Sequence, residues 1–202
     1  MTLTLGRSQQ IVEAAYELLA EKGLEGLTIR AVLKKTGLSR RAFYERFADK
    51  DDLVVAVFEQ TIRLAAQYYA SQIEALSDPL ERLKHIITSV VLGSAGEGEH
   101  SDRRGAAMSR EHLRLAESRP DDLQAALHPL LALIAHQVSE GMQVGLVREA
   151  DPQRLATLVY NLVSTTVHTE LLGQKKLHVD RSRHGQLASD IWEFCRRAIA
   201  AP

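Results

Sequence analysis

The stretch TIRAVLKKTGLSRRAFYERFADKDDL, from Thr28 to Leu53, decides the fold of this chain. Thr28 carries a side-chain oxygen of the kind that caps a helix, and the apolar residues after it recur at helical spacing. Gly37 can supply the left-handed backbone with which many helices end, and Ser39 can cap the helix that follows. The stretch therefore predicts two short helices joined by a tight turn.

The second of these helices has two different faces. One face is apolar and is expected to point toward a core, while arginines and a tyrosine fall on or beside the other. The core-facing residues are Ala42, Phe43 and Phe47, and those of the opposite face are Arg40, Arg41 and Tyr44. In a helix-turn-helix, the N-terminal turn of such a second helix contacts the base edges of DNA. The pattern therefore indicates a DNA-reading segment.

Positive charge is concentrated in the same stretch. Between Thr28 and Lys50 there are seven Lys or Arg residues and two acids, a local net charge of +5, whereas the whole chain has a net charge of −1. Phosphate neutralisation supplies most of the sequence-independent affinity for DNA, so the cations of such a protein must gather where the backbone passes. A run of charge alone is usually a solvated helix face. Here the run coincides with caps and a turn glycine, which favours DNA binding.

The segment from about residue 7 to residue 58 resembles the N-terminal DNA-binding domain of TetR-type one-component transcriptional regulators. The residues that carry the resemblance are Glu21-Lys22-Gly23 at the end of an amphipathic first helix, Leu27-Thr28-Ile29, Thr36-Gly37-Leu38-Ser39, Phe43-Tyr44, Phe47, and Asp49-Lys50 followed by Leu53. Leu33 and Thr36 depart from the pattern, because the family generally has small residues at these two positions. Both lie at the contact between the second and third helices, which sets the pose of the recognition helix.

The resemblance implies DNA-binding roles for seven residues. Thr28, Tyr44 and Lys50 match positions that grip the DNA backbone, and such contacts position the domain without specifying sequence. The residues that match the turn entering the major groove are Ser39, Arg40, Arg41 and Ala42. An arginine there can bind O6 and N7 of guanine, so Arg40 and Arg41 are the expected base readers. Outside this context, Tyr44 would be interpreted as a packing aromatic and Lys50 as a solvated lysine.

Helical periodicity continues through the chain, and no stretch shows the sustained alternation of a strand. An apolar stripe over residues 11–19 predicts a first helix that packs on the helix pair and completes a small three-helix domain. Breakers divide the remainder into further helices at about 51–76, 79–92, 104–118, 121–147, 153–172 and 184–200. The expected fold is all-α with nine helices, the number that the resemblance also implies. We expect a helix-turn-helix domain over residues 1–50 and a helical ligand-binding and dimerisation domain over residues 51–202.

Several other classes of protein find no support in the sequence. No segment resembles a secretion signal or has the apolar run of a membrane span, so a cytoplasmic protein is expected. The single cysteine, Cys195, permits no intrachain disulfide and is expected to be a buried thiol. Gly93, Gly96 and Gly98 form no phosphate-binding fingerprint, and the eight histidines fall in no metal-ligand motif. Since no nucleophile lies in a recognisable setting beside a base, we expect no enzymatic activity, no metal and no cofactor.

The resemblance implies that the second domain binds a small molecule between its helices. The expected pocket walls are Tyr68, Met108, His112, Leu115, Leu130, Ile134, Gln137, Tyr160, Ser164 and His168. A stripe of this kind is also compatible with an ordinary core. His112, His136 and His168 are expected to face the interior, either as hydrogen-bonded core histidines or as contacts to a polar group of the ligand. The pocket suggests a largely apolar ligand with one or two polar groups.

A homodimer through the last two long helices is also implied by the resemblance. The apolar sides that fit this role consist of Leu155, Leu158, Val159, Leu162 and Thr166 on one helix, and Leu187, Ile191, Phe194, Cys195 and Ala198 on the other. Either side could instead pack within the subunit. A twofold dimer would present paired recognition helices to double-stranded DNA and so prefer a palindromic operator. The implied function is a ligand-responsive regulator, usually a repressor. The alternatives are a non-specific structural DNA-binding protein and a ligand-binding protein without DNA regulation.

Overall fold

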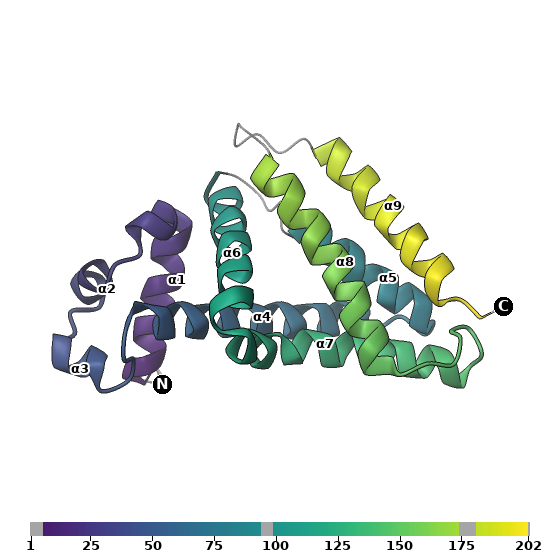
Figure 1. Ribbon diagram of the computed structural model, residues 1–202, viewed down its shortest axis with the longest axis horizontal. Coiled ribbons are helices and arrows are strands. Elements are labelled where there is room, and N and C mark those ends of the chain that lie inside the picture. The colour runs from purple at the N-terminus through teal and green to yellow at the C-terminus, as the bar shows by residue number, and fades with distance from the viewer. Residues whose placement is uncertain (1–5, 94–98, 174–180, 202) are drawn as a thin grey trace.

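The computed structural model describes residues 6–93, 99–173 and 181–201, and these ranges are almost entirely α-helical. In chain order the helices are α1 (Arg7–Gly26), α2 (Ile29–Thr36), α3 (Arg40–Tyr44), α4 (Lys50–Ile73), α5 (Pro79–Gly93), α6 (Glu99–Ser118), α7 (Pro120–Gln143), α8 (Pro152–Gly173) and α9 (Arg181–Ile199). Figure 1 shows α1, α2 and α3 grouped at one end, with α4 running from them into the larger group of helices. The predicted all-α fold with nine helices is confirmed for the described ranges.

Side-chain caps and a glycine define the ends of the short helices, as the sequence predicts. Oγ1 of Thr28 accepts a hydrogen bond from the backbone N–H three residues later at 3.1 Å, and Oγ of Ser39 does the same at 3.2 Å. Gly37 ends α2 with a φ of 70°, a left-handed conformation that glycine adopts without strain. Asp49 caps α4 by accepting from a backbone N–H at 2.9 Å. The orientation of α3 is therefore fixed by interactions that are local in the sequence.

The first three helices share a small core with the beginning of α4. Leu19 of α1, Val32 of α2 and Phe43 of α3 are buried, and Leu53 and Val57 of α4 complete the cluster. The predicted stripe on α1 is buried throughout, at Ile11, Ala14, Ala15, Leu18 and Leu19. Burying one large apolar side chain contributes about 1.5–3 kcal/mol. Because α2 and α3 are too short to be stable alone, this packing holds them in place.

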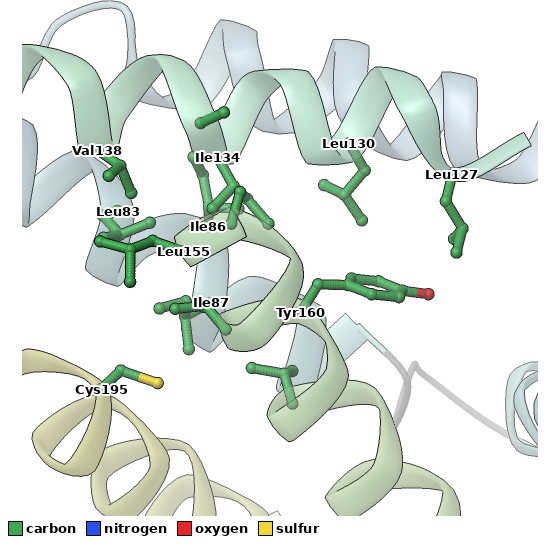
Figure 2. Packing of buried hydrophobic residues seen from close by; sticks show 14 of the residues in the cluster. Leu83, Ile86, Ile87, Leu127, Leu130, Ile134, Val138, Leu155, Tyr160 and Cys195 are labelled. Atoms are coloured by element: carbon green, nitrogen blue, oxygen red, sulfur yellow. The ribbon is translucent and has the colours of Figure 1, made fainter. Parts of the chain in front are cut away.

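The remaining helices enclose a second, larger core. In it α7 packs against α4, α5 and α8, and α5 packs against α9. Figure 2 shows aliphatic side chains of these helices meeting, among them Leu83 and Ile86 of α5 and Val138 of α7. Cys195 of α9 is buried as predicted, and burial raises the pKa of its thiol to about 11. The thiol therefore behaves as a packing group.

Helix α6 belongs to both cores. It packs against α1 of the N-terminal group and against α7 and α8 of the second domain, as Figure 1 also shows. Ala107 lies in the N-terminal core, whereas Leu115, two turns further along, lies in the second. A displacement of α6 would therefore be felt in both domains.

Some helix ends differ from those predicted. Helix α6 begins at Glu99, not at 104, and α7 ends at Gln143, not at 147. Gly145, with a φ of 74°, provides the left-handed residue that ends α7, a signal that the sequence prediction passed over. The connection between the helices predicted at 79–92 and 104–118 includes residues 94–98, which lie outside the described ranges, and residues 99–103 are helical. Within the described parts of the chain, no helix combines the length and apolar character needed to span a membrane.

Candidate nucleic-acid interface and ligand cavity

Helix α3 presents most of its predicted DNA-binding side chains to solvent. Tyr44 is 53% exposed, and the side chain of Arg41 is 89% exposed. Ser39 and Arg40 are exposed as well. Ala42 differs, since only 6% of its surface is exposed. It packs toward the core formed by α1, α2, α3 and the beginning of α4, the part of the chain called the head from here on. Contact with base edges therefore stays a prediction for its exposed neighbours.

Arg41 is held by an acid on the same helix. Its Nε lies 3.0 Å from Oε1 of Glu45, one turn along, and Arg46 also contacts Glu45 at 3.4 Å. An exposed pair of this spacing is worth only about 0.3–0.5 kcal/mol. Arg41 can therefore exchange its carboxylate partner for a base edge at little cost.

The three predicted backbone grips lie at the edges of the helix pair. Oγ1 of Thr28 accepts the capping hydrogen bond, and because a hydroxyl both accepts and donates, its proton can still reach a phosphate. The ring of Tyr44 packs edge-on against Phe43, with the ring centroids 5.3 Å apart, which braces its exposed hydroxyl. Lys50 is the first residue of α4, and its Nζ lies 3.5 Å from the carbonyl oxygen of Leu24 in α1. Contact with DNA stays a prediction for each of them.

Leu33 and Thr36, which replace the small residues of the family pattern, are accommodated at the contact between α2 and α3. Oγ1 of Thr36 donates to the carbonyl of Val32 at 2.9 Å and accepts from the N–H of Leu38 at 3.3 Å. Leu33 is partly buried against the core of the head. Thr36 thus ties the end of α2 to the turn, a role that a small apolar residue could not fill.

A cavity of about 680 Å³ lies among α4, α5, α6, α7 and α8. Seven of the ten predicted pocket residues line it, namely Tyr68, Met108, His112, Leu130, Tyr160, Ser164 and His168. Leu115, Ile134 and Gln137 are buried elsewhere in the second domain, because the inner face of a helix continues beyond the cavity into close-packed core. Contact of any of these residues with a ligand stays a prediction.

The sequence prediction missed a large part of the cavity wall. Half of the twelve missed residues lie on α4, at Phe58, Thr61, Ile62, Leu64, Ala65 and Tyr69. Their helical spacing was visible in the sequence, but it does not separate a cavity wall from a core. Tyr16 of α1 also lines the cavity, so a ligand there would touch the DNA-binding head directly.

The polar groups of the cavity gather around His112. Its Nδ1 lies 3.4 Å from the hydroxyl oxygen of Tyr160, and its ring centroid lies 4.7 Å from that of His168 and 5.8 Å from that of Phe58. Burial lowers the pKa of His112 to about 4, with a further contribution from His168, whose own pKa is also lowered by burial. Both imidazoles are therefore neutral near pH 7. His136 was predicted to face the interior, which is wrong, because its side chain is 65% exposed on the outer face of α7.

Ion pairs tie the beginning of α4 to α6 and α7. Arg114 of α6 lies 2.9 Å from Asp51, and Arg119, at the start of α7, lies 2.8 Å from Asp52. Asp52 also accepts the backbone N–H of Ala48 at 2.8 Å. This hydrogen bond, together with Arg119, holds the pKa of Asp52 below its usual value. The helix that leaves the head is thus fixed to the helices that form the cavity.

Geometry of this kind defines a class of protein. An exposed, basic reading helix and a cavity in the adjoining domain, joined through α4 and α6, belong to a ligand-responsive DNA-binding transcriptional regulator. Among the described residues, no group of three or more His, Cys, Asp or Glu side chains is placed to hold a metal ion.

Comparison with known proteins gives the family. Residues 11–57 match the family described as bacterial regulatory proteins, tetR family. The fatty acid metabolism regulator protein of Bacillus subtilis is 23% identical over 168 residues, which cover 83% of this chain and 84% of that protein. The N-terminal segment of this chain is therefore that of a TetR-type regulator, and a weaker likeness to such regulators extends over most of the chain.

Two further proteins show how the similarity is distributed. The HTH-type transcriptional repressor AcnR of Corynebacterium diphtheriae is 34% identical over 76 residues, or 37% of this chain and 40% of the repressor. The crystal structure of the transcriptional regulator FadR of Bacillus subtilis, in complex with stearoyl-CoA, superposes with a TM-score of 0.68 at 21% identity. That superposition covers 92% of this chain and 96% of FadR. The fold is therefore shared over nearly the whole length, while the relatives differ in how much of the sequence they share.

Proposed function

We propose that this chain is a repressor that binds a palindromic operator as a homodimer and is released from it by a small, largely apolar effector. The observation that carries the proposal is the exposed basic surface of α3, which lies on the same chain as the 680 Å³ cavity. The name of AcnR, a repressor, supports the direction of regulation. A regulator of this kind acts in the cytoplasm, where a bacterial operator lies, and needs no catalytic step.

In this proposal the exposed side chains of the head divide into two groups. Thr28, Tyr44 and Lys50 grip phosphates and set the position of α3, without reading sequence. Arg40 and Arg41 read base edges in the major groove, where a bidentate contact to guanine discriminates by about 1–3 kcal/mol. The hydroxyl of Ser39 lies beside them at the start of α3.

Dimerisation would cover apolar side chains that the subunit leaves exposed. Leu158 of α8 is 56% exposed and Phe194 of α9 is 64% exposed, whereas Val159 and Ile191 beside them are buried in the subunit. Large exposed apolar side chains on the two helices that the family resemblance assigns to dimerisation support a second copy as the occupant. We therefore keep residues 51–202 as the ligand-binding and dimerisation domain and 1–50 as the DNA-binding domain, with α4 joining them.

The effector follows from the character of the cavity. Its volume falls within the range of about 300–1,000 Å³ that is usual for small-molecule sites. Apolar residues such as Phe58, Ile62 and Leu130 make up much of its wall. Bacillus subtilis FadR, which has the same fold, was crystallised with stearoyl-CoA. The acyl chain of that ligand is apolar, as the wall of this cavity is.

The signal would pass through α6 and α4. Met108 and His112 line the cavity from α6, and Arg114, on the same helix, pairs with Asp51 at the start of α4. A ligand that fits only one arrangement of these helices would change the spacing of the two recognition helices in the dimer. The shift in DNA affinity cannot exceed the difference between the ligand's affinities for the two arrangements.

The decisive test is selection of fragments of the source genome that the purified protein binds, followed by sequencing. A regulator should enrich a palindrome and bind it at least about a thousandfold more tightly than unrelated DNA. A structural DNA-binding protein would instead bind all fragments with an affinity that falls steeply with salt. A ligand-binding protein without DNA regulation would enrich nothing, and either of these last two results would overturn the proposal.

A further inference from the structure

One end of the 680 Å³ cavity carries hydrogen-bonding groups that could orient a ligand. We infer that His112 and His168 form a seat for one uncharged oxygen acceptor, such as the carbonyl of an ester, thioester or ketone, on an otherwise apolar effector. The inference rests on the proposed function, because it specifies the chemical class of ligand for the same cavity.

Charge is the first observation that limits the ligand. The titratable side chains in the described wall are two histidines and four tyrosines, namely His112, His168, Tyr16, Tyr68, Tyr69 and Tyr160. No Lys, Arg, Asp or Glu is found among the described lining residues. An ionised group buried without a partner of opposite charge is strongly disfavoured. The part of the ligand that enters this cavity is therefore uncharged.

Three of the hydroxyl groups of the wall are engaged by the backbone. Thr61 donates to a carbonyl of its own helix at 2.8 Å, and Ser164 is placed to do the same at 3.4 Å. The hydroxyl of Tyr69 lies 3.4 Å from the carbonyl oxygen of Ser89. A hydroxyl has a single proton to donate, so these groups offer a ligand little beyond acceptance.

The two imidazoles retain hydrogen-bonding capacity. The structure gives no hydrogen bond between a described residue and Nε2 of His112 or either ring nitrogen of His168. Among the described side chains, the one polar atom that is fully enclosed and lacks a partner is Oε1 of Gln137. The unpaired imidazole nitrogens are therefore not fully enclosed, and both histidines line the cavity.

Tyr160 decides which of these nitrogens carries the proton. In Figure 2 its ring extends from α8 beneath Leu130, and its hydroxyl ends beneath Leu127. Burial raises the pKa of Tyr160, so the phenol keeps its proton, and Nδ1 of His112 is the acceptor within reach at 3.4 Å. A phenol oxygen can also accept a hydrogen bond, but the proton of Tyr160 has no other acceptor among the described residues, so we assign His112 the tautomer with its proton on Nε2. His112 then presents an N–H donor to the cavity, which is why the ligand must supply an acceptor.

The first experiment uses the unmodified full-length protein and two matched series of probes. Methyl esters of saturated acids with 8–18 carbons are compared with n-alkylbenzenes of similar length, which lack oxygen, by displacement of an apolar fluorescent dye. One neutral hydrogen bond should make the preferred ester bind about three- to tenfold more tightly than its alkylbenzene counterpart. Equal affinities throughout the series, or no ester binding at all, would overturn the inference.

Variants then locate the preference. His112→Phe keeps an aromatic ring and removes the donor, so the ester should lose its three- to tenfold advantage while alkylbenzene binding is unchanged. His136→Phe replaces an exposed histidine on α7 and serves as the control, with the ester preference intact. Tyr160→Phe removes the hydrogen bond to Nδ1 of His112, so the proton of His112 can lie on either ring nitrogen. The ester preference should then fall only in part. If His112→Phe does not fold, as judged by circular dichroism, the Tyr160→Phe result decides, and an undiminished preference would overturn the inference.

Charge is tested with the sodium carboxylates of the same lengths. A carboxylate should bind more weakly than its methyl ester at pH 8 and should take up a proton on binding, which calorimetry in buffers of different ionisation enthalpy measures. Carboxylate binding as tight as ester binding, without proton uptake, would contradict an uncharged seat.

Esters that follow the predicted pattern but never release operator DNA would leave the seat intact and overturn the proposed regulation. If esters and alkylbenzenes release operator DNA equally well, and His112→Phe does not alter this, the proposed regulation stands and the inference about the seat is overturned.

Discussion

The two binding surfaces of this chain are built in opposite ways. The DNA-binding residues all lie between Thr28 and Lys50, and their orientation is set by hydrogen bonds that span three residues. The cavity is lined by side chains from α1 and from five helices of the second domain, so its wall draws on residues as far apart as Tyr16 and His168. A surface of the first kind is assembled by local structure, whereas one of the second kind exists only after the whole domain has packed.

The chemistry of the two surfaces differs in the same way. Arg41 and Tyr44 work in water, where charge attracts the phosphates of DNA and the arginine's ion pair with Glu45 is weak. His112 and His168 are mostly buried, and their burial lowers the pKa of both. In the proposed function the head therefore recognises a charged polymer through exposed cations, while the cavity is proposed to favour a neutral ligand because it offers no counterion among its described residues.

The largest expected effect is that of Phe43→Ala, which tests whether the two regions are independent. Phe43 is fully buried in the core of the head, and removing such a ring costs about 3–5 kcal/mol. DNA binding should be lost, while ester binding in the cavity is retained. Chemical unfolding, gel-shift assays and calorimetry on one preparation measure the three quantities.

Tyr44→Phe is the matched control for this change. It alters the next residue of α3, which is an exposed aromatic, so stability should stay within about 0.5 kcal/mol of the original. DNA affinity should fall by a similar factor for every sequence, since a phosphate contact is lost. Loss of ester binding in Phe43→Ala would show that the cavity depends on the head, against the separation argued above.

How much the sequence could predict follows from the same contrast. The caps at Thr28 and Ser39, the turn at Gly37 and the buried stripe on α1 were all predicted, because each is a local pattern with a known geometry. Cavity residues were predicted only in part. Ile134 and Leu130 lie one turn apart on the same face of α7, yet only Leu130 reaches the cavity. Whether an inward apolar side chain meets a neighbour or a void depends on the packing of other helices, which periodicity does not contain.

The pH dependence of stability is the second expected effect. The pKa of His112 is about 4 in the folded chain and 6.5 in the unfolded one, so the unfolded chain binds more protons between these values. The stability due to neutral His112 is therefore complete above about pH 6.5 and is lost as the pH falls toward 4. The loss is on the order of 2–3 kcal/mol.

Urea unfolding at several pH values between 7.5 and 4.5 measures this loss. His112→Phe should show a shallower decline of stability than the original chain, and His136→Phe provides the control at an exposed position. His168 contributes in the same direction, since burial lowers its pKa as well. An unchanged decline in His112→Phe would mean that His112 is hydrated in the folded state and that the seat described above is open to water.

The third expected effect concerns sequence reading. Arg41→Ala should cost about 1–3 kcal/mol at one base pair of the operator and relax the preference there. Lys50→Ala should weaken binding to all sequences about equally and reduce the dependence of affinity on salt. Binding measured against a set of operator variants at two salt concentrations separates these results. A uniform loss in Arg41→Ala would assign this residue to the phosphates and leave base reading to Arg40.

The smallest expected effect lies where the two regions meet. Arg114→Met removes the ion pair with Asp51 and also the one with Glu111 on the same helix, at 2.8 Å. The pair with Asp51 joins side chains that are 37% and 46% exposed, so its loss alone should lower stability by less than about 1 kcal/mol. DNA affinity without ligand should change little, because neither residue lies on the reading face of α3. The change in DNA affinity caused by a bound ester should shrink, since α6 is then joined less firmly to α4.

Arg110→Met, on an exposed position of the same helix, is the control and should leave the ester response unchanged. Asp51→Asn should reproduce the effect of Arg114→Met, and the double variant should add little, because both changes remove one interaction. An additive double variant would show that the two residues act separately. Coupling between the regions would then have to run through apolar contacts such as that of Ala107, which carries α6 into the core of the head.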